Sequence, residues 1–347
     1  MKKLIAILLT LAMMLSLVAC GGNSSSPSDN ASSSSSSKTN NDTPKTIPVR
    51  ISVSESASNI IGQGYTLLAE KLEELSGGVF ECEVFYDGTY CSSTEALTEM
   101  AKGNLEIGPS GATYVAEYVP QYGFLQMAYL YDNYEHALKV LNGEIGKKIF
   151  QVVADSTGTL PIGAYYFGSR NIMLTKDLKV EKPEDLASIK MRTNGLESMM
   201  NMMRAMGANP VGVALSETYG ALQTGVVDGQ ENPIAGCIAY NFPEVSKSWT
   251  YTEHYIDCSW IACSYEWFQS LTPELQDVVY EAVLAACEVV TANVLETEAK
   301  TDEILAEAGV AVYRIDKTPF EEAAIEYYSQ FYDEWDTEML NAILASK

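Results

Sequence analysis

Strand-like and helix-like stretches alternate along most of the chain, and this alternation limits the possible folds more than any other feature. The strand-like stretch 49–54 is followed by 60–75, where leucines recur on one helical face before Gly77-Gly78 ends the pattern. A second series of the same kind begins near Leu160. Strands that alternate with helices usually pair in parallel sheets that the helices cover. The sequence therefore predicts an α/β protein, and the about 300 residues beyond its N-terminal segment are enough for two lobes.

The remaining elements follow from the same patterns. The further strand-like stretches are 79–85, 105–108, 161–167, 189–192, 210–214, 226–228, 259–263 and 310–314, and the further helical ones are 94–102, 196–206, 216–222, 273–309 and 319–344. We expect 259–263 to return to the sheet of the first lobe. The stretch 273–309 has no proline after Pro273 and almost no glycine, so we expect one long helix that runs beneath both lobes.

The N-terminus has the pattern of an export signal. Residues 1–19 contain two lysines and an apolar run that is shorter than the roughly 20 apolar residues needed to cross a bilayer. The run ends in the letters LVAC, with Cys20 last, and this resembles the bacterial lipobox, in which the cysteine is acylated and becomes the new first residue. Residues 20–46 are mostly Ser, Asn, Asp and Thr, which is typical of a flexible tether. We therefore expect a lipid anchor on Cys20 that holds the exported protein at the outer face of the cytoplasmic membrane.

The charge balance restricts the partners of the chain. It has 46 acidic and 22 basic residues and a formal net charge of −24, and removal of Lys2 and Lys3 with the signal would make this −26. Such a chain repels phosphate backbones. We therefore exclude nucleic acid as a partner, and an anionic ligand requires a local positive group.

Six cysteines follow Cys20, and none of them stands in a Cys-x-x-Cys motif. With only two histidines the chain shows no metal-site spacing, and it has no Walker A or Gly-x-Gly-x-x-Gly motif, so we predict no metal and no cofactor. Export permits disulfides. We expect most of the six to be small core residues, and only Cys82 with Cys91 and Cys258 with Cys263 are close enough in sequence to suspect a disulfide.

The segment QTGVVDGQENP, residues 223–233, concentrates polar side chains on a turn. Asp228 and Glu231 could form a glycosidase-type pair, but such carboxylates normally come from different elements that face each other across a cleft. Nucleophilic catalysis would need an activated serine, and no Gly-x-Ser-x-Gly motif is present. We therefore predict no enzymatic activity and interpret the segment as one wall of a binding site.

Arg192 is the strongest candidate for ligand binding. It ends the apolar strand-like stretch 189–192, and residues at the carboxyl end of such strands face a ligand crevice. Its guanidinium keeps its charge and presents a planar fork that matches a carboxylate. The alternative is an ordinary surface arginine at the end of a strand.

Two segments carry a resemblance to a known family. They are SIKMRTNG, which contains Arg192, and MGANPVGVALSETYGALQTGVVDGQENP, residues 206–233. They resemble the signature region of the solute-binding proteins of tripartite ATP-independent periplasmic (TRAP) transporters, the DctP-like family. The resemblance implies a two-lobed solute-binding fold with a cleft between the lobes, which close on a small carboxylate by a hinge motion. It also implies delivery of that solute to large and small membrane subunits.

The resemblance implies roles for individual residues as well. Arg192 would form the salt bridge with the ligand carboxylate, and Arg170 would be the second basic residue near it. Asn232 would hydrogen-bond the ligand, while Asp228, Gly229 and Glu231 would shape and cap the turn. Leu215 stands where the family often has an aromatic residue that packs on the ligand.

In the first lobe the expected contacts come from strand ends. Gly111 and Tyr114 occupy the strand-to-helix loop that usually contacts the ligand in this family. Gly111 replaces an acidic residue of the sialic-acid-binding members, which disfavours sialic acid as the ligand. Glu55, Ser92 and Trp260 lie at other strand ends that we expect to face the cleft.

The resemblance also predicts lobe boundaries. Residues 47–168 and 258–297 would form lobe I, and residues 169–257 and 298–347 would form lobe II. A binding lipoprotein of an ABC importer or of a sensory receptor is the alternative function, and gene neighbourhood would separate the three. The identity of the carboxylate is not indicated by the sequence.

Overall fold

The computed structural model describes residues 46–347, which belong to one compact unit. The predicted signal peptide 1–19, the lipidation site Cys20 and all but the last residue of the tether 20–46 lie outside the described residues.

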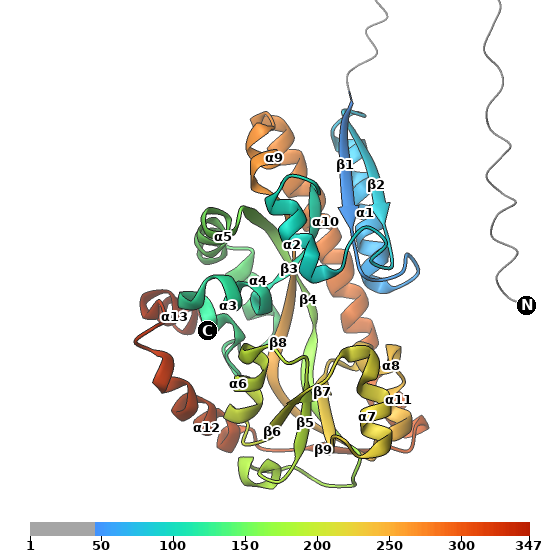
Figure 1. The fold of residues 1–347 in the computed structure, drawn as a ribbon, viewed down its shortest axis with the longest axis vertical. Coiled ribbons are helices and arrows are strands. Elements are labelled where there is room, and N and C mark those ends of the chain that lie inside the picture. Colours follow the sequence, from blue (N-terminus) through green and yellow to red (C-terminus); the bar gives the residue numbers. More distant parts are fainter. Residues whose placement is uncertain (1–45) are drawn as a thin grey trace, which may run out of the picture. The chain divides into compact units, whose positions relative to one another are not determined.

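One mixed sheet of nine strands organises the described part of the chain (Figure 1). Its strands are β1 (Ile47–Ser52), β2 (Phe80–Phe85), β3 (Ile107–Gly111), β4 (Thr159–Leu174), β5 (Lys190–Thr193), β6 (Asn209–Gly212), β7 (Gly229–Asn232), β8 (Ser248–Ser264) and β9 (Ala311–Arg314). The order is β2-β1-β3-β8-β4-β7-β5-β6, and β9 pairs with β8. The α/β class predicted from the sequence is confirmed.

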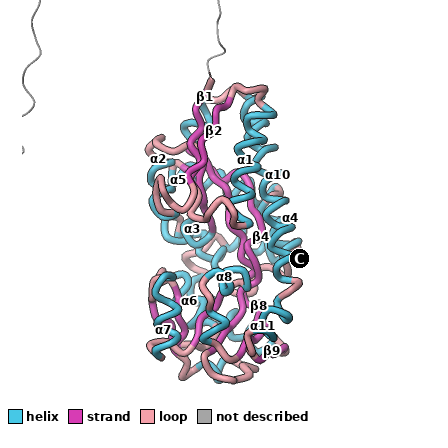
Figure 2. Tube along the Cα trace, turned by 90° about the vertical axis from the view of Figure 1, so that its right-hand side faces the viewer, coloured by secondary structure: helices cyan, strands magenta, loops and turns pink. Residues whose placement is uncertain are grey.

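The two longest strands correct the expectation of separate parallel sheets. β4 and β8 are much longer than predicted and pair with each other in antiparallel orientation from Thr159 to Leu174. At one end β8 pairs with β3, and at the other end β4 pairs with β7 and β8 with β9. In Figure 2, β1 and β2 accordingly lie at one end and β9 at the other, with β4 between them. We call the end around β1–β3 lobe I and the end around β5–β7 lobe II; the lobe boundaries stay a prediction.

The helices cover this sheet. They are α1 (Ile60–Leu75), α2 (Ser93–Ala101), α3 (Ala112–Tyr118), α4 (Tyr134–Leu141), α5 (Glu144–Thr157), α6 (Glu197–Ala205), α7 (Thr218–Thr224), α8 (Ile234–Ala239), α9 (Tyr265–Ser270), α10 (Pro273–Glu298), α11 (Thr301–Glu307), α12 (Thr318–Tyr328) and α13 (Thr337–Leu344). Local signals explain where several of them begin. The side chain of Asn59 accepts a hydrogen bond from the backbone N–H of Ile61 at the start of α1, and Thr272 caps α10 in front of Pro273.

The single long helix predicted over 273–309 is interrupted. α10 ends at Glu298 and α11 begins at Thr301, whose hydroxyl donates to the backbone oxygen of Glu298, 2.7 Å away. The Glu298 carboxylate accepts hydrogen bonds from the backbone N–H of Ser169 and the hydroxyl of Tyr166 in β4. α10 is long and apolar enough to cross a membrane, yet it packs against β4 and α1 as a core helix.

The cysteine pairs suspected from the sequence are not bonded, and all six cysteines of the described residues are free. Cys258 and Cys263 lie five residues apart on one extended strand, so at about 3.3 Å per residue their Cα atoms are far beyond the separation of about 7 Å that a disulfide allows. Four of the six are buried, which agrees with the expectation of small core residues.

The middle of β4 contains a glycine that the packing requires. Gly168 has φ +136° at a break in the β4–β8 register, and a Cβ on it would lie 2.5 Å from Cβ of Pro233. That backbone region is accessible almost only to glycine. Both the conformation and the contact therefore exclude a side chain at this position.

We predict that Gly168→Ala lowers the free energy of unfolding by about 3 kcal/mol, because strain and overlap with Pro233 add together. Gly103→Ala is the matched control, since Gly103 has φ +73° and open space around its Cβ position. The free energy of unfolding of the Gly103→Ala control should fall by about 1 kcal/mol. Urea unfolding followed by circular dichroism measures both, and equal losses would contradict the packing argument.

Candidate functional site

A cavity of about 730 Å³ lies between the two lobes, at the carboxyl ends of β1, β5 and β7. Its lining comes from loops and helix starts of both lobes: Ser54, Glu55, Ser56, Asn59, Ile60, Ile61, Asp87, Ser93, Thr113, Phe167, Arg170, Arg192, Asn194, Met199, Leu215, Glu231, Asn232, Ala235, Gly236, Ala239, Tyr240 and Val294. The volume is in the range of small-molecule binding sites, about 300–1,000 Å³. We call it the main cleft.

Arg192 reaches the main cleft with a free guanidinium fork. It is only 3% exposed, and Nε donates to the backbone oxygen of Val213 at 2.9 Å, which fixes the plane of the group. Among the described residues no other hydrogen bond holds its side chain, and its two Nη atoms have no acceptor there. Burial lowers the pKa of Arg192 to about 10; the nearby charge of Glu231 opposes this shift, and the charge of Arg170 adds to it. The site therefore favours an anion at this fork.

Arg170 also lines the main cleft, but its hydrogen bonds go to the protein. In β4 it forms a two-pronged ion pair with Glu231, and Nη1 donates to Asp257 at 2.8 Å. Nη2 also donates to Oδ1 of Asn232 at 2.9 Å. The sequence predicted Arg170 as a second ligand contact, whereas the structure gives its guanidinium three protein partners.

Glu231 is the buried counterion of Arg170. Its side chain is fully buried in β7, and Nε2 of His254 lies 3.5 Å from its Oε2. Burial alone would raise the pKa of Glu231, but the charge and hydrogen bonds of Arg170 together with His254 outweigh it and lower the pKa to about 2. The role predicted for Glu231, shaping of the turn, is therefore corrected. Asp228, which was predicted to share that role, does tie the turn to β5 by accepting from the backbone N–H of Lys190.

Asn232 lies in the wall of the main cleft with both ends of its amide in use. Oδ1 accepts from Arg170 and Nδ2 donates to Oε1 of Gln230 at 2.6 Å. Leu215 lies on the same side of the cleft and is 37% exposed. Lobe II thus presents a rigid polar wall around the single free fork of Arg192.

Lobe I contributes hydroxyls and a carboxylate. Glu55 lines the main cleft, and in the described part of the chain no other side chain hydrogen-bonds to its carboxylate. Burial raises the pKa of Glu55. The hydroxyls of Ser54 and Ser93 bond to each other at the same edge. This wall is suited to accept hydrogen bonds from a hydroxylated molecule.

Other candidates from lobe I lie outside the main cleft. Trp260 is fully buried and its ring centroid lies 4.9 Å from that of Phe150 in α5, because its position on β8 faces that helix. Ser92 is the cap of α2, and its neighbour Ser93 reaches the cleft instead. Gly111 and Tyr114 line a neighbouring cavity of about 390 Å³ that also touches both lobes.

The sequence interpretation missed several cleft residues. Asn194 lines both interlobe cavities and follows Arg192 by two positions, so its place just after the strand was the available signal. Asn59 was recognisable as a helix cap but not as a cleft residue. Tyr240 follows α8, and nothing in its local sequence indicates that it reaches the cleft.

Comparisons with known proteins concern the family and the fold. Residues 51–334 match the family described as "Bacterial extracellular solute-binding protein, family 7", DctP. A solute-binding protein of Roseobacter denitrificans is 30% identical over 74% of this chain and 78% of its own length. A TRAP solute-binding protein structure from Roseobacter denitrificans with bound 3-deoxy-D-manno-oct-2-ulosonic acid superposes with a TM-score of 0.80 at 28% identity, covering 87% of this chain and 100% of that chain. One from Pseudomonas putida F1 with bound D-glucuronate gives 0.78 at 27% identity, covering 86% and 97%.

We predict that Glu231→Gln lowers the free energy of unfolding by about 3 kcal/mol, because it leaves Arg170 buried with Asp257 as its only anionic partner. The pKa of Glu231 is depressed in the fold, so its stabilising contribution is present above the unfolded pKa, about 4.3, and is lost as the pH falls toward 2. The difference in the free energy of unfolding between the wild type and Glu231→Gln, measured by urea unfolding, should therefore shrink below about pH 4.

Glu253→Gln is the control for this prediction. Glu253 pairs with Lys317 at 2.8 Å, but both side chains are partly exposed, so the loss should stay below about 1 kcal/mol. If Glu231→Gln and Glu253→Gln lowered the free energy of unfolding by similar amounts, burial would not explain a difference in strength between the two ion pairs.

Proposed function

The chain belongs to the DctP family, the bacterial extracellular solute-binding proteins of family 7, and from that premise we propose that it captures a small hydroxylated carboxylate through Arg192 and delivers it to the membrane subunits of a TRAP-type transporter. The family is one of solute-binding proteins and not of enzymes. The observation that carries the proposal is the free guanidinium fork of Arg192 in the main cleft.

The charges around the cleft support binding of an acid. The positive charge of Arg170 is balanced by Glu231 and Asp257, whereas Arg192 has no ion pair within the described residues. A carboxylate on the Arg192 fork would form two parallel charge-assisted hydrogen bonds, worth about 1.5–3 kcal/mol net for each bond to a charged group. A ligand without an anion would leave the buried guanidinium uncompensated, which disfavours neutral solutes.

The wall contributed by lobe I supports a hydroxylated acid. A carboxylate such as that of Glu55 accepts hydrogen bonds, and the nearby hydroxyls of Ser54 and Ser93 can donate or accept. Similar proteins have been solved with 3-deoxy-D-manno-oct-2-ulosonic acid and with D-glucuronate bound. Both ligands combine one carboxylate with several hydroxyls, which is the chemistry that Arg192 and Glu55 together would select.

Capture would proceed by closure of the lobes. β4, β8 and α10 connect the two ends of the sheet, and the main cleft lies beside these connections. Hinge bending of such connecting segments is a common closing motion. The segment 228–232 would then act as a fixed wall against which the solute is enclosed, and no bond of the solute would be broken. We also propose that acylated Cys20 anchors the protein to the membrane, as the sequence predicts.

We predict that Arg192→Gln lowers solute affinity on the order of 100-fold, while Arg192→Lys has a smaller effect because it keeps the charge and loses the fork. Thermal shifts of refolded protein with D-glucuronate, D-galacturonate, L-galactonate and D-erythronate identify the ligand, and calorimetry on the responding acid gives the affinities. The matching neutral sugars serve as controls. Unchanged affinity of Arg192→Gln, or a response to neutral sugars alone, would overturn the assignment of Arg192.

A second prediction concerns Glu55. Since burial raises its pKa, its carboxylate becomes protonated at a higher pH than an ordinary glutamate, and it then loses capacity to accept hydrogen bonds from the solute. Affinity should therefore fall as the pH is lowered through this raised pKa, and Glu55→Gln should remove that part of the pH dependence. Asp87 and Arg192 line the same cleft and remain in both proteins, so comparing the two affinity profiles isolates Glu55. If the affinity of the wild type and that of Glu55→Gln changed with pH in parallel, Glu55 would not bind the solute.

A further inference from the structure

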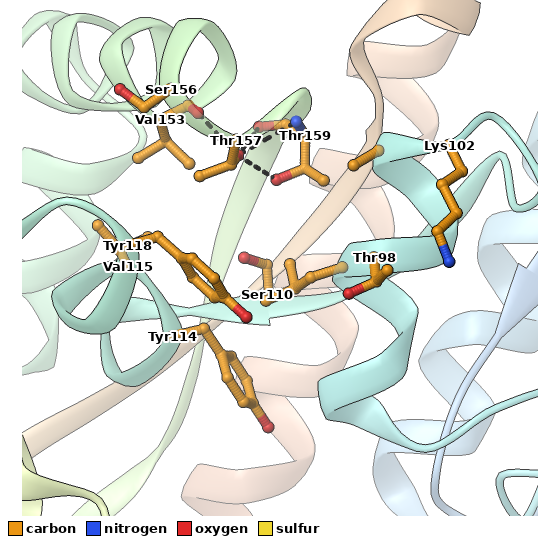
Figure 3. Close-up of a pocket in the computed structure, with 12 residues that line it drawn as sticks. Thr98, Lys102, Ser110, Tyr114, Val115, Tyr118, Val153, Ser156, Thr157 and Thr159 are labelled. Carbon is orange, nitrogen blue, oxygen red and sulfur yellow. Dashed lines mark hydrogen bonds between the residues drawn. The ribbon is translucent and has the colours of Figure 1, made fainter.

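A second cavity, of about 290 Å³, lies within lobe I between α2, α3 and α5 (Figure 3). Arg192 does not line it, and neither does any other residue of lobe II. Although the chain has 46 acidic residues, the described residues that line this cavity include no aspartate or glutamate, and Lys102 at the edge is the one charged residue among them. We call it the lobe I cavity.

The floor of the lobe I cavity carries an unpaired hydroxyl. Ser110 is 4% exposed, and its Oγ has no hydrogen-bond partner among residues 46–347. Figure 3 shows this hydroxyl directed into the space between Thr157 and Tyr118. The Thr157 hydroxyl, in contrast, bonds to the backbone oxygen of Val153 and to Thr159. Because a buried hydroxyl without a partner costs free energy, Ser110 is an unused attachment point for a polar group.

The walls of the lobe I cavity combine aromatic and aliphatic surface with the hydroxyls of Thr98, Ser156, Thr157 and Thr159. Tyr118 is 61% exposed, and its ring lies beside Ser110 in Figure 3. Leu97, Val115 and Val153 supply aliphatic surface. Tyrosine rings stack in offset or edge-on geometry against other rings, and an apolar pocket with few polar groups is typical of small-molecule sites.

We propose that the lobe I cavity is a second ligand site, for an uncharged molecule of one or two aromatic rings that carries one hydrogen-bonding group. The ring packs between Tyr118 and the aliphatic wall, and the polar group bonds to Oγ of Ser110. A volume of about 290 Å³ limits the ligand to this size. This proposal does not depend on the function of the main cleft.

The lobe I cavity shares a wall with an interlobe cavity. Tyr114 and Ser110 line both the lobe I cavity and the cavity of about 390 Å³ that Asn194 and Leu196 line from lobe II. In Figure 3 the Tyr114 hydroxyl points away from Ser110. An occupant of the lobe I cavity therefore contacts a side chain that also faces lobe II.

Indole and phenol are the probes that test the proposal with the purified protein. Calorimetry or ligand-observed NMR should show saturable binding of one indole per chain. Ser110→Ala removes the hydrogen bond and should weaken indole binding about fivefold. Thr98→Trp places a bulky side chain from the exposed face of α2 into the cavity and should abolish binding. Glu117→Trp is the control, because this exposed residue of α3 does not line the cavity.

Thermal unfolding shows whether each variant is folded, and Thr98→Trp and Glu117→Trp both change exposed positions, so their folds should persist. Binding that does not saturate, or that is equal in wild type and Thr98→Trp, would overturn the site. Equal affinity in wild type and Ser110→Ala would overturn the role of the hydroxyl. Solute binding at Arg192 should be retained in all three variants, which separates this test from that of the main cleft.

Discussion

The buried ion pair between Arg170 and Glu231 is the interaction on which the main cleft depends. It joins β4 to β7, and the contact of Arg170 with Asp257 adds β8, so three strands of lobe II are fixed by one guanidinium. Two arginines that lie close together would otherwise repel each other. Because Glu231 and Asp257 neutralise Arg170, Arg192 is left as the cation available to a ligand, even though burial lowers its pKa to about 10.

The same region is where the two lobes are connected. The β4–β8 pairing is irregular near Gly168 and Arg170, and α10 ends beside it at Glu298. The Glu298 carboxylate lies 2.7 Å from the backbone nitrogen of Ser169, so the end of the helix is tied to the irregular part of the strand. The polar wall of the cleft and the connections that would bend during closure are therefore parts of one hydrogen-bonded assembly.

The distribution of charge separates the two candidate sites of this acidic chain. In the main cleft an unpaired cation in lobe II faces the carboxylate of Glu55 in lobe I, which suits a ligand that has both an acid and hydrogen-bond donors. Among the described residues, the walls of the lobe I cavity include no carboxylate, and Ser110 contributes a buried hydroxyl without a partner. The two sites therefore differ in the chemistry that they can recognise, although Tyr114 and Ser110 connect the second site to the space between the lobes.

Local features could be read from the sequence because neighbouring residues produce them. Helical periodicity and the Gly77-Gly78 stop predict α1, and the apolar strand before Arg192 places that side chain at the cleft. Long-range pairing was not readable. The antiparallel pairing of β4 with β8 and the burial of Trp260 against α5 each depend on residues far apart in the chain. The sequence by itself determined the α/β class and the family, whereas the tertiary structure decided which of two strand arginines is free of an ion pair within residues 46–347, because only folding brings Glu231 and Asp257 to Arg170.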